Sequence, residues 1–160
     1  MPGTRITIRR AVSEDVEAIA SVLSESPEIS WSESQVREEI DGKGRLALVG
    51  CCHGMLVGFC FVRALDETAE LLLIAIRSQV RRRGYASEIA KQIAVELKGI
   101  GVREVFLEVR KSNEGAIQFY RELGYIQVDV RRKYYRNPVD DAILLKLPLT
   151  DCQRDDRGLD

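Results

Sequence analysis

Apolar residues recur along the chain with two different spacings, which divide it into predicted strands and helices. In residues 5–11, Ile6 and Ile8 alternate with polar residues, which indicates a half-buried strand. In residues 13–26 apolar positions recur every three or four residues, which predicts an amphipathic helix. Ser32 and Gln35 have the spacing of a capping box, and Trp31 precedes them as a hydrophobic staple, so we expect a second short helix that ends near Ile40.

The middle of the chain changes to strand patterns. Apolar stretches at 46–52 and 55–65 flank a His-Gly turn, which predicts a hairpin. The stretch at 69–76 is too apolar to have a wet face, so we expect a fully buried strand at the centre of the sheet. The remaining predicted elements are a helix from Gly84 to Gly99 or Gly101, a strand at 104–109, a helix at 113–123 with Asn113 as its N-cap, and strands at 125–135 and 142–149.

This order of elements predicts an α/β fold. We expect a mixed, mostly antiparallel sheet of about seven strands, with helices on both faces. The length of 160 residues, with 45% hydrophobic and 31% charged residues, fits one globular domain. We expect that domain to span residues 1–149, followed by a polar, disordered tail at 150–160.

The charge balance removes two classes of partner. Lys and Arg number 24 against 25 Asp and Glu, so the net charge of -1 gives no overall attraction to nucleic acid or to an anionic membrane. No apolar run approaches the roughly 18 residues of a membrane span, and the first residues lack the apolar stretch of a signal peptide. We therefore expect a cytoplasmic protein whose basic residues act locally.

The cysteines do not indicate a metal site. Cys51, Cys52, Cys60 and Cys152 show no C-x-x-C spacing, and the single histidine, His53, cannot complete a zinc cluster with them. We expect reduced thiols and no metal.

Three consecutive arginines, Arg81, Arg82 and Arg83, stand between the apolar stretch at 69–76 and the helix that follows Gly84. A helix start after a glycine-bearing loop presents free backbone N–H groups and the positive end of the helix dipole, which suits phosphate. The stretch matches neither the Walker pattern nor the dinucleotide pattern of glycines. The triplet is either an anion site or a solvated charge cluster.

Two further residues combine reactive groups with apolar surroundings. Glu108 lies between Leu107 and Val109 in a predicted strand, where a carboxylate needs either an ion-pair partner or a chemical task. Tyr120 shares an apolar helical face with Ile117, where a tyrosine is either part of the core or a functional hydroxyl.

Four blocks in this order resemble the GNAT superfamily of N-acetyltransferases. They are "RRRGYA" at the helix start, "LEVRKSNEGAIQFYRELGY", "RRKYY" and "AILLKL", and the resemblance covers about residues 4 to 148. The loop of that superfamily reads Q/R-x-x-G-x-G/A, and Arg81, Gly84 and Ala86 match it. The segments "WSES" and "DETAELLLIAI" also look like the bacterial acetyltransferases that modify the N-terminal alanine of a small-subunit ribosomal protein.

The resemblance implies acetyl-coenzyme A as the acetyl donor and assigns roles to individual residues. It implies Glu108 as the general base and Tyr120 as the acid that protonates the departing thiolate. It implies that Arg82 and Arg83 add charge to a loop whose backbone holds the pyrophosphate. The implied donor-binding residues are Ile74, Ala75, Ile76, Arg81, Arg82, Arg83, Gly84, Tyr85, Ala86, Ser87 and Asn113, and the implied acceptor-binding residues are Trp31, Tyr134 and Tyr135.

The chemistry of the acceptor favours a protein N-terminus. An α-amine titrates near about 7.7–8.0 and a lysine near about 10.4, so deprotonation at neutral pH costs roughly 3–4 kcal/mol less for the α-amine. No histidine lies where it could activate Cys51, Cys52 or Cys60 for an acyl-enzyme, so we expect direct transfer. Two alternatives stay open: an acetyltransferase of the same fold acting on lysine or a small amine, and a coenzyme A-binding module without catalysis.

Overall fold

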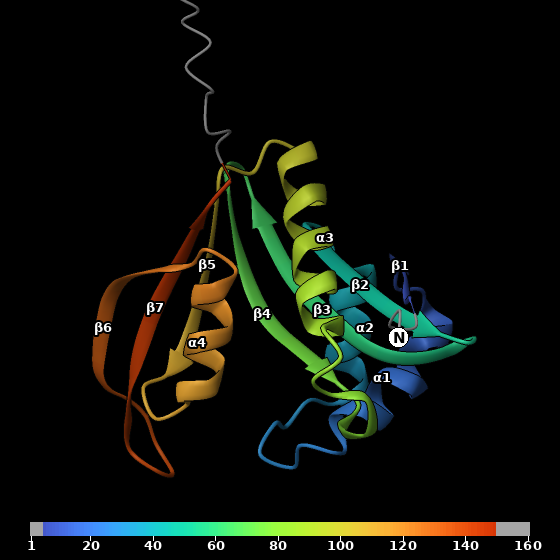
Figure 1. Cartoon of the computed structure of the whole chain (residues 1–160), viewed down its shortest axis with the longest axis horizontal. Helices are drawn as coiled ribbons and strands as arrows, with labels where there is room; N and C mark the ends of the chain where they lie inside the picture. The colour runs from blue at the N-terminus through green and yellow to red at the C-terminus, as the bar shows by residue number, and fades with distance from the viewer. Residues whose placement is uncertain (1–4, 150–160) are drawn as a thin grey trace, which may run out of the picture.

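The computed structural model describes residues 5–149, which form one seven-stranded sheet with helices on both faces (Figure 1). The strand order is β1-β2-β3-β4-β5-β7-β6, and β4 and β5 run parallel while the other neighbours are antiparallel. The predicted α/β fold is therefore confirmed. The elements are β1 (Thr7–Arg10), α1 (Val16–Leu23), α2 (Glu33–Asp41), β2 (Arg45–Cys52), β3 (Met55–Leu65), β4 (Thr68–Ile76), α3 (Tyr85–Gly99), β5 (Glu104–Arg110), α4 (Glu114–Glu122), β6 (Ile126–Tyr135) and β7 (Asp140–Pro148), with 3-10 turns at Ser13–Asp15 and Ser78–Val80.

Two apolar clusters hold the helices to the sheet. The larger cluster joins α3 and α4 to one face, and it includes Ile89 and Leu97 of α3 and Leu145 of β7, none of them measurably exposed. The smaller cluster joins α1 and α2 to the other face around Phe59 and Phe61. The sheet therefore separates two pairs of helices, α3 and α4 from α1 and α2.

The predicted helix starts are confirmed at two caps. The backbone N–H of Gln35 donates to Ser32 Oγ at 3.2 Å, and the Gln35 side chain accepts from the Ser32 N–H at 2.7 Å, which completes the capping box of α2. Asn113 Oδ1 accepts from the Ala116 N–H at 3.2 Å and caps α4.

The first helix begins later than its apolar spacing predicts. A 3-10 turn occupies Ser13–Asp15, and the α-helix itself starts at Val16. The carboxylate of Asp15 accepts the Val12 N–H at 2.8 Å and two hydrogen bonds from Arg9 of β1. These contacts hold residues 12–15 to the first strand, and the helix begins after them.

The expectation that the stretch at 69–76 has no wet face is wrong for its second half. Residues Leu72–Ala75 are only partly buried. The reason is that β4 pairs with β5 only through Thr68–Glu70, after which the two strands diverge, as Figure 1 shows. Of the residues beyond Glu70, Ile74, Ala75 and Ile76 line a cavity at this opening, whereas Leu71 stays in the core. The predicted tail at 150–160, with Cys152, lies outside the described residues.

Candidate active site

The split between β4 and β5 gives the sheet a free internal edge. Both strands keep their other neighbours, since β4 pairs with β3 as far as Ile76 and β5 pairs with β7 along its whole length. In the described chain no strand pairs with the β5-facing edge of β4 beyond Glu70. Backbone donors and acceptors on that edge are available to an extended ligand.

One cavity opens beside this edge on the face that carries α3, and we call it the α3-side cavity. Its volume is about 500 Å³. Of the residues that resemblance implies for the donor, all except Arg83 and Asn113 line it. The wall also contains Ser26 and Ile29 from the connection between α1 and α2, together with Val80, Phe119 and Glu122.

The backbone of the loop before α3 is shaped to hold an anion. Arg82 has a φ of 64° and Gly84 a φ of 81°, so the loop contains two left-handed residues, the kind of backbone from which anion-binding concavities are built. The Gly84 carbonyl accepts the first helical hydrogen bond, from Glu88, so the N–H groups of Ala86 and Ser87 precede the hydrogen-bond ladder of α3. A Cβ atom at Gly84 would meet nothing within 4 Å, so glycine serves the backbone angle here and not a lack of space.

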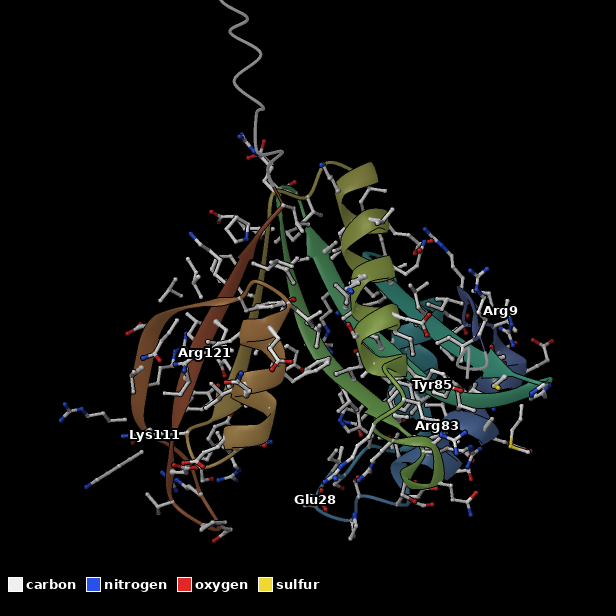
Figure 2. All side chains as sticks on the ribbon, viewed as in Figure 1. Arg9, Glu28, Arg83, Tyr85, Lys111 and Arg121 are labelled. Atoms are coloured by element: carbon white, nitrogen blue, oxygen red, sulfur yellow. The ribbon has the colours of Figure 1, made fainter. Side chains whose placement is uncertain are left out.

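The three arginines of this loop have different surroundings. Arg81 and Arg82 line the α3-side cavity, whereas Arg83 does not. Arg81 Nε donates to the Ile76 carbonyl at 3.2 Å, which holds that side chain against the end of β4. Figure 2 labels Arg83 and Tyr85 in this region of the molecule. The position of Arg82 makes it the better placed of the two residues expected to add charge to a bound phosphate.

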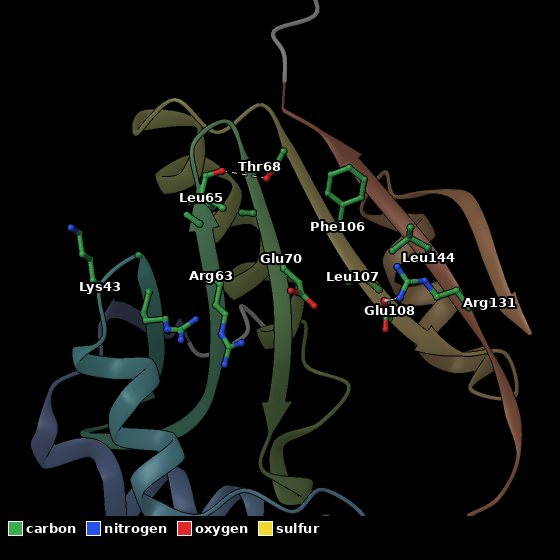
Figure 3. A pocket seen from close by; sticks show the side chains of 14 residues that line it. Lys43, Arg63, Leu65, Thr68, Glu70, Phe106, Leu107, Glu108, Arg131 and Leu144 are labelled. Carbon is green, nitrogen blue, oxygen red and sulfur yellow. Dashed lines mark hydrogen bonds and ion pairs between the residues drawn. The ribbon is translucent and has the colours of Figure 1, made fainter. Parts of the chain in front are cut away.

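A second cavity, of about 640 Å³, opens at the same split on the face that carries α2, and we call it the α2-side cavity (Figure 3). Even-numbered residues of β5 face it, because Val105, Leu107 and Val109 point into the core on the other face. Its charged lining side chains are Lys43, Arg45, Arg63, Glu70, Glu108 and Arg131, and Phe106 and Leu144 supply apolar surface.

Glu108 is half-buried in this cavity and has an ion-pair partner. Arg131 Nη1 lies 3.1 Å from Glu108 Oε1, and the dashed line in Figure 3 marks the pair. The strand that carries Glu108 is therefore apolar on one face only, which corrects the expectation of a buried strand. The ion pair that the sequence left open as an alternative is present.

The two tyrosines of β6 lie close to this pair. The Arg131 guanidinium carbon is 5.4 Å from the centre of the Tyr134 ring, and that of Arg110 is 4.3 Å from the centre of the Tyr135 ring. Burial raises the pKa of Tyr135, and the negative charge of Glu108 raises it further. The sequence-based acceptor residues Tyr134 and Tyr135 therefore belong to the surroundings of Glu108.

Trp31 and Tyr120 lie deeper in the protein. Trp31 packs on Phe61 of β3 with ring centres 5.5 Å apart. Tyr120 is 8% exposed and makes edge-to-face contacts with Phe119 and Tyr125. Burial raises the pKa of its hydroxyl, and the neighbouring thiol of Cys60 adds to that increase. Tyr120 does not itself line the α3-side cavity, although Phe119 beside it does.

The three cysteines of the described residues, Cys51, Cys52 and Cys60, and the histidine His53 line neither cavity. Cys60 is fully buried, and burial raises the pKa of its thiol. Cys51 and Cys52 are free thiols at the end of β2, and His53 is exposed in the turn that follows. Within residues 5–149 no group of His, Cys, Asp and Glu side chains is placed to hold a metal ion. In the same residues no helix is long and apolar enough to cross a membrane.

Several residues of the two cavities were not identified from the sequence. Glu70 stands between Ala69 and Leu71, so the acid-in-an-apolar-strand pattern that identified Glu108 could have identified it too. Arg131 was read only as part of the "RRKYY" block. Ser26 and Ile29 carry no local signal, because they reach the cavity only through the packing of α1 against the sheet.

Comparison with known proteins agrees with this geometry. The model of the acetyltransferase (GNAT) family matches residues 16–125. The ribosomal protein bS18-alanine N-acetyltransferase of Escherichia coli (strain K12) is 28% identical over 146 residues, which cover 90% of this chain and 98% of that relative. The crystal structure of the ribosomal-protein-S18-alanine N-acetyltransferase from Escherichia coli has a TM-score of 0.85 at 27% identity, covering 94% of this chain and 98% of that one. The PaiA N-acetyltransferase from Thermoplasma acidophilum, solved in complex with coenzyme A, shares the fold with a TM-score of 0.76 at 20% identity, covering 90% of this chain and 99% of that one.

Proposed function

We propose that this chain, which belongs to the acetyltransferase (GNAT) family and is an N-acetyltransferase, transfers the acetyl group of acetyl-coenzyme A to the N-terminal α-amine of a protein. The observation that carries the proposal is the split between β4 and β5, which has an arginine-bearing loop and a helix start at a cavity on one face and a carboxylate in a cavity on the other. Donor and acceptor can then approach from opposite faces of the sheet. We assign this activity to a single domain over residues 1–149.

The α3-side cavity provides the features that acetyl-coenzyme A needs. The backbone N–H groups of the loop around Arg82 and Gly84 would hold the pyrophosphate, with the start of α3 adding its dipole. The free edge at Ile74–Ile76 would pair with the amide groups of the pantetheine arm. The donor supplies a thioester, whose carbonyl carbon is open to attack by an amine.

Glu108 is the proposed general base. An ammonium has no lone pair, so it must lose a proton before it can attack, and a carboxylate can accept that proton directly or through one water. Glu108 is half-buried in the α2-side cavity, where an acceptor entering from the α2 face would meet it. Glu70 lines the same cavity and, with Glu108, offsets part of the positive charge of Lys43, Arg45, Arg63 and Arg131.

Tyr120 is the proposed acid for the departing thiolate. Its hydroxyl is held protonated at neutral pH, because burial raises its pKa above the ordinary value. The raised pKa makes the hydroxyl a weaker acid, so its proposed task is to donate a hydrogen bond, and then the proton, to the thiolate that forms as the carbon–sulfur bond breaks. The alternative, that Tyr120 serves only in the core, is supported by its contacts with Phe119 and Tyr125, and a Phe substitution separates the two.

The acceptor is a protein N-terminus, with a ribosomal protein as the proposed partner. The Escherichia coli enzyme, similar to this chain both in sequence and in crystal structure, is named for acetylation of an alanine of ribosomal protein S18. Tyr134 and Tyr135 would contact the peptide next to the reacting amine, since both lie beside the Glu108 and Arg131 pair. The easier deprotonation of an α-amine, by roughly 3–4 kcal/mol, gives it an advantage over lysine before any contact is counted.

A peptide panel tests this function. Purified protein would be given acetyl-coenzyme A and peptides that begin with alanine and contain one lysine, each with a free or a blocked N-terminus. We expect acetylation of the free α-amine, located by tandem mass spectrometry, and none when the N-terminus is blocked. Label found chiefly on lysine, or faster transfer to polyamines, would favour the small-amine or lysine alternative, and binding without transfer would favour a coenzyme A-binding module.

A further inference from the structure

Arg131 reaches Glu108 from two strands away. In the sheet β7 lies between β5 and β6, and its residue Ala142 pairs with Arg131 on one side and with Arg110 on the other. Paired residues of neighbouring strands share a face, so Arg131, Ala142 and Arg110 form one row, and Glu108 stands in the next row on that face. The Arg131 guanidinium reaches across β7 to Glu108, as Figure 3 shows.

The Arg131 side chain is fixed at two points by these contacts. Nη1 lies 3.1 Å from Glu108 Oε1, and the Tyr134 ring lies 5.4 Å from the guanidinium carbon. The pairing of β6 with β7 shifts register just after Arg131, and within the shift the Lys133 N–H donates to Asp141 Oδ1 at 2.8 Å. In a regular strand, residues three positions apart point to opposite faces. The irregularity instead places Tyr134 beside Arg131.

Stability alone does not account for this ion pair. The Arg131 side chain is 50% exposed, and exposed pairs of this kind contribute little to folding because water screens them and two long side chains lose freedom. A glutamate in an open cavity otherwise has several rotamers, and fixing one of them costs conformational entropy. The effect of this pair is therefore to hold the Glu108 carboxylate in one orientation within the cavity.

We propose that Arg131 is the positioning residue for the catalytic base: it holds Glu108 Oε1 so that Oε2 is directed at the acceptor amine. This inference rests on the proposed role of Glu108. The proton leaves the acceptor ammonium for Oε2, directly or through one water, while Arg131 stays on Oε1 and takes no part in the transfer. Glu108 then uses one carboxylate oxygen for the ion pair with Arg131 and the other to accept the proton.

A double-mutant cycle tests the inference. The variants are Arg131→Gln, Arg131→Lys, Glu108→Gln and the double variant of Arg131→Gln with Glu108→Gln. The matched control is Arg132→Gln, which removes the same charge one residue further along β6, from an exposed side chain that lines neither cavity. Each variant is measured for kcat, for KM of peptide and of acetyl-coenzyme A, and for melting temperature.

We expect Arg131→Gln to lower kcat by about tenfold or more, because a misplaced base loses near-attack geometry. KM for acetyl-coenzyme A and the melting temperature should stay at the wild-type values, and Arg131→Lys should recover part of kcat. In the double variant, the Arg131 substitution should cause no further loss, since the carboxylate it positions is gone.

Two different results separate the possible failures. If Glu108→Gln is inactive while Arg131→Gln keeps wild-type kcat, or if the two losses simply multiply, the positioning role is wrong and the general base stands. If Glu108→Gln itself keeps wild-type kcat, the proposed base is wrong, and the inference about Arg131 is overturned with it.

Discussion

The carboxylate of Glu25 accepts a hydrogen bond from the backbone N–H of Ser78 at 2.7 Å. Glu25 follows α1, and Ser78 begins the 3-10 turn that leads into the arginine loop. The pKa of Glu25 lies below its ordinary value, chiefly because of this N–H and further because of the nearby charges of Arg77 and Arg81. Arg77 adds a second link, since its Nη1 donates to Ser21 Oγ of α1 at 3.2 Å. The loop that would hold the donor is thus tied to the connection that leads to Trp31.

Removal of the hydrogen bond between Glu25 and Ser78 should weaken the binding of acetyl-coenzyme A. We expect Glu25→Ala to raise the dissociation constant by about tenfold, the order expected for loss of one charge-assisted hydrogen bond that orders a binding loop. The amide oxygen of Glu25→Gln can still accept from Ser78, so its dissociation constant should lie between those of the wild type and Glu25→Ala. Calorimetric titration measures the affinity, and Glu28→Ala in the same exposed connection is the control (Figure 2). Equal affinities for Glu25→Ala and Glu28→Ala would show that the link has no part in donor binding.

Backbone shape and charge can be separated at Arg82. Glycine adopts the φ of 64° found there without strain, so Arg82→Gly keeps the loop shape and removes only the side chain. We expect Arg82→Gly to lower the affinity for acetyl-coenzyme A modestly. Arg82→Glu should lower that affinity by at least about tenfold, because the reversed charge repels phosphate. Arg83→Glu, at a residue that does not line the cavity, is the matched control. An Arg82→Glu protein that is folded and binds as wild type would identify the triplet as a solvated cluster.

Replacement of the proposed base should remove turnover and leave donor binding unchanged. We expect Glu108→Gln to lower kcat by about 10²–10⁴, because the amide keeps the shape of the side chain and cannot accept the proton. Glu70→Gln changes the other carboxylate of the same cavity and should affect KM for peptide more than kcat. Steady-state kinetics between pH 6 and 9 give both constants. Near wild-type turnover in Glu108→Gln, with chemistry limiting the rate, would leave Glu108 with a structural role alone.

The contribution of Tyr120 should not depend on pH in the neutral and mildly alkaline range. Its pKa is raised by burial above the ordinary value of about 10, so the hydroxyl carries its proton at every pH below that value. We therefore expect Tyr120→Phe to lower kcat by about 10²–10⁴, by the same factor at pH 7 and at pH 9. Parallel pH-rate profiles of the two proteins provide the measurement. A loss that disappears toward pH 9 would mean that another group titrates, and no loss at all would return Tyr120 to the core.

The elements of the fold were predictable because their signals are local. The capping box at Ser32 and Gln35 and the cap at Asn113 each involve residues three positions apart, and both are formed. The apolar stretch at 69–76 was misread as fully buried because its second half depends on how β4 meets β5. That pairing joins Thr68 to Glu104, residues far apart along the chain, and no local pattern reports where it stops.

Candidate residues could be selected from the sequence, and their contacts could not. Glu108 and the arginine loop were selected as a carboxylate in an apolar strand and a basic loop at a helix start, and their proposed roles came from the resemblance to the GNAT superfamily. The partner of Glu108 was missed because Arg131 reaches it across a whole strand, over Ala142. The link between Glu25 and Ser78 joins residues 53 positions apart. The left-handed φ of Arg82 could not be predicted, because arginine has no preference for that conformation.

The β6 tyrosines offer the last test, because their surroundings differ. Tyr135 is half-buried under Arg110, whose Nη1 also donates to the Pro138 carbonyl at 2.9 Å, so its ring is held at the start of the β6–β7 turn. Tyr134 is 48% exposed. A ring that is already fixed loses little freedom when a peptide binds against it, so Tyr135 should contribute more to peptide affinity than Tyr134.

We expect Tyr135→Ala to raise KM for an alanine-initiated peptide by about tenfold and Tyr134→Ala to raise it less, with KM for acetyl-coenzyme A unchanged in both. Tyr135→Phe keeps the ring under Arg110 and removes only the hydroxyl, so it divides the effect between stacking and hydrogen bonding. Initial rates at saturating acetyl-coenzyme A with varied peptide provide the measurement, and melting temperatures show whether each variant is folded. If Tyr135→Ala is folded and changes KM for both substrates equally, the ring supports the sheet around Glu108 and does not contact the peptide.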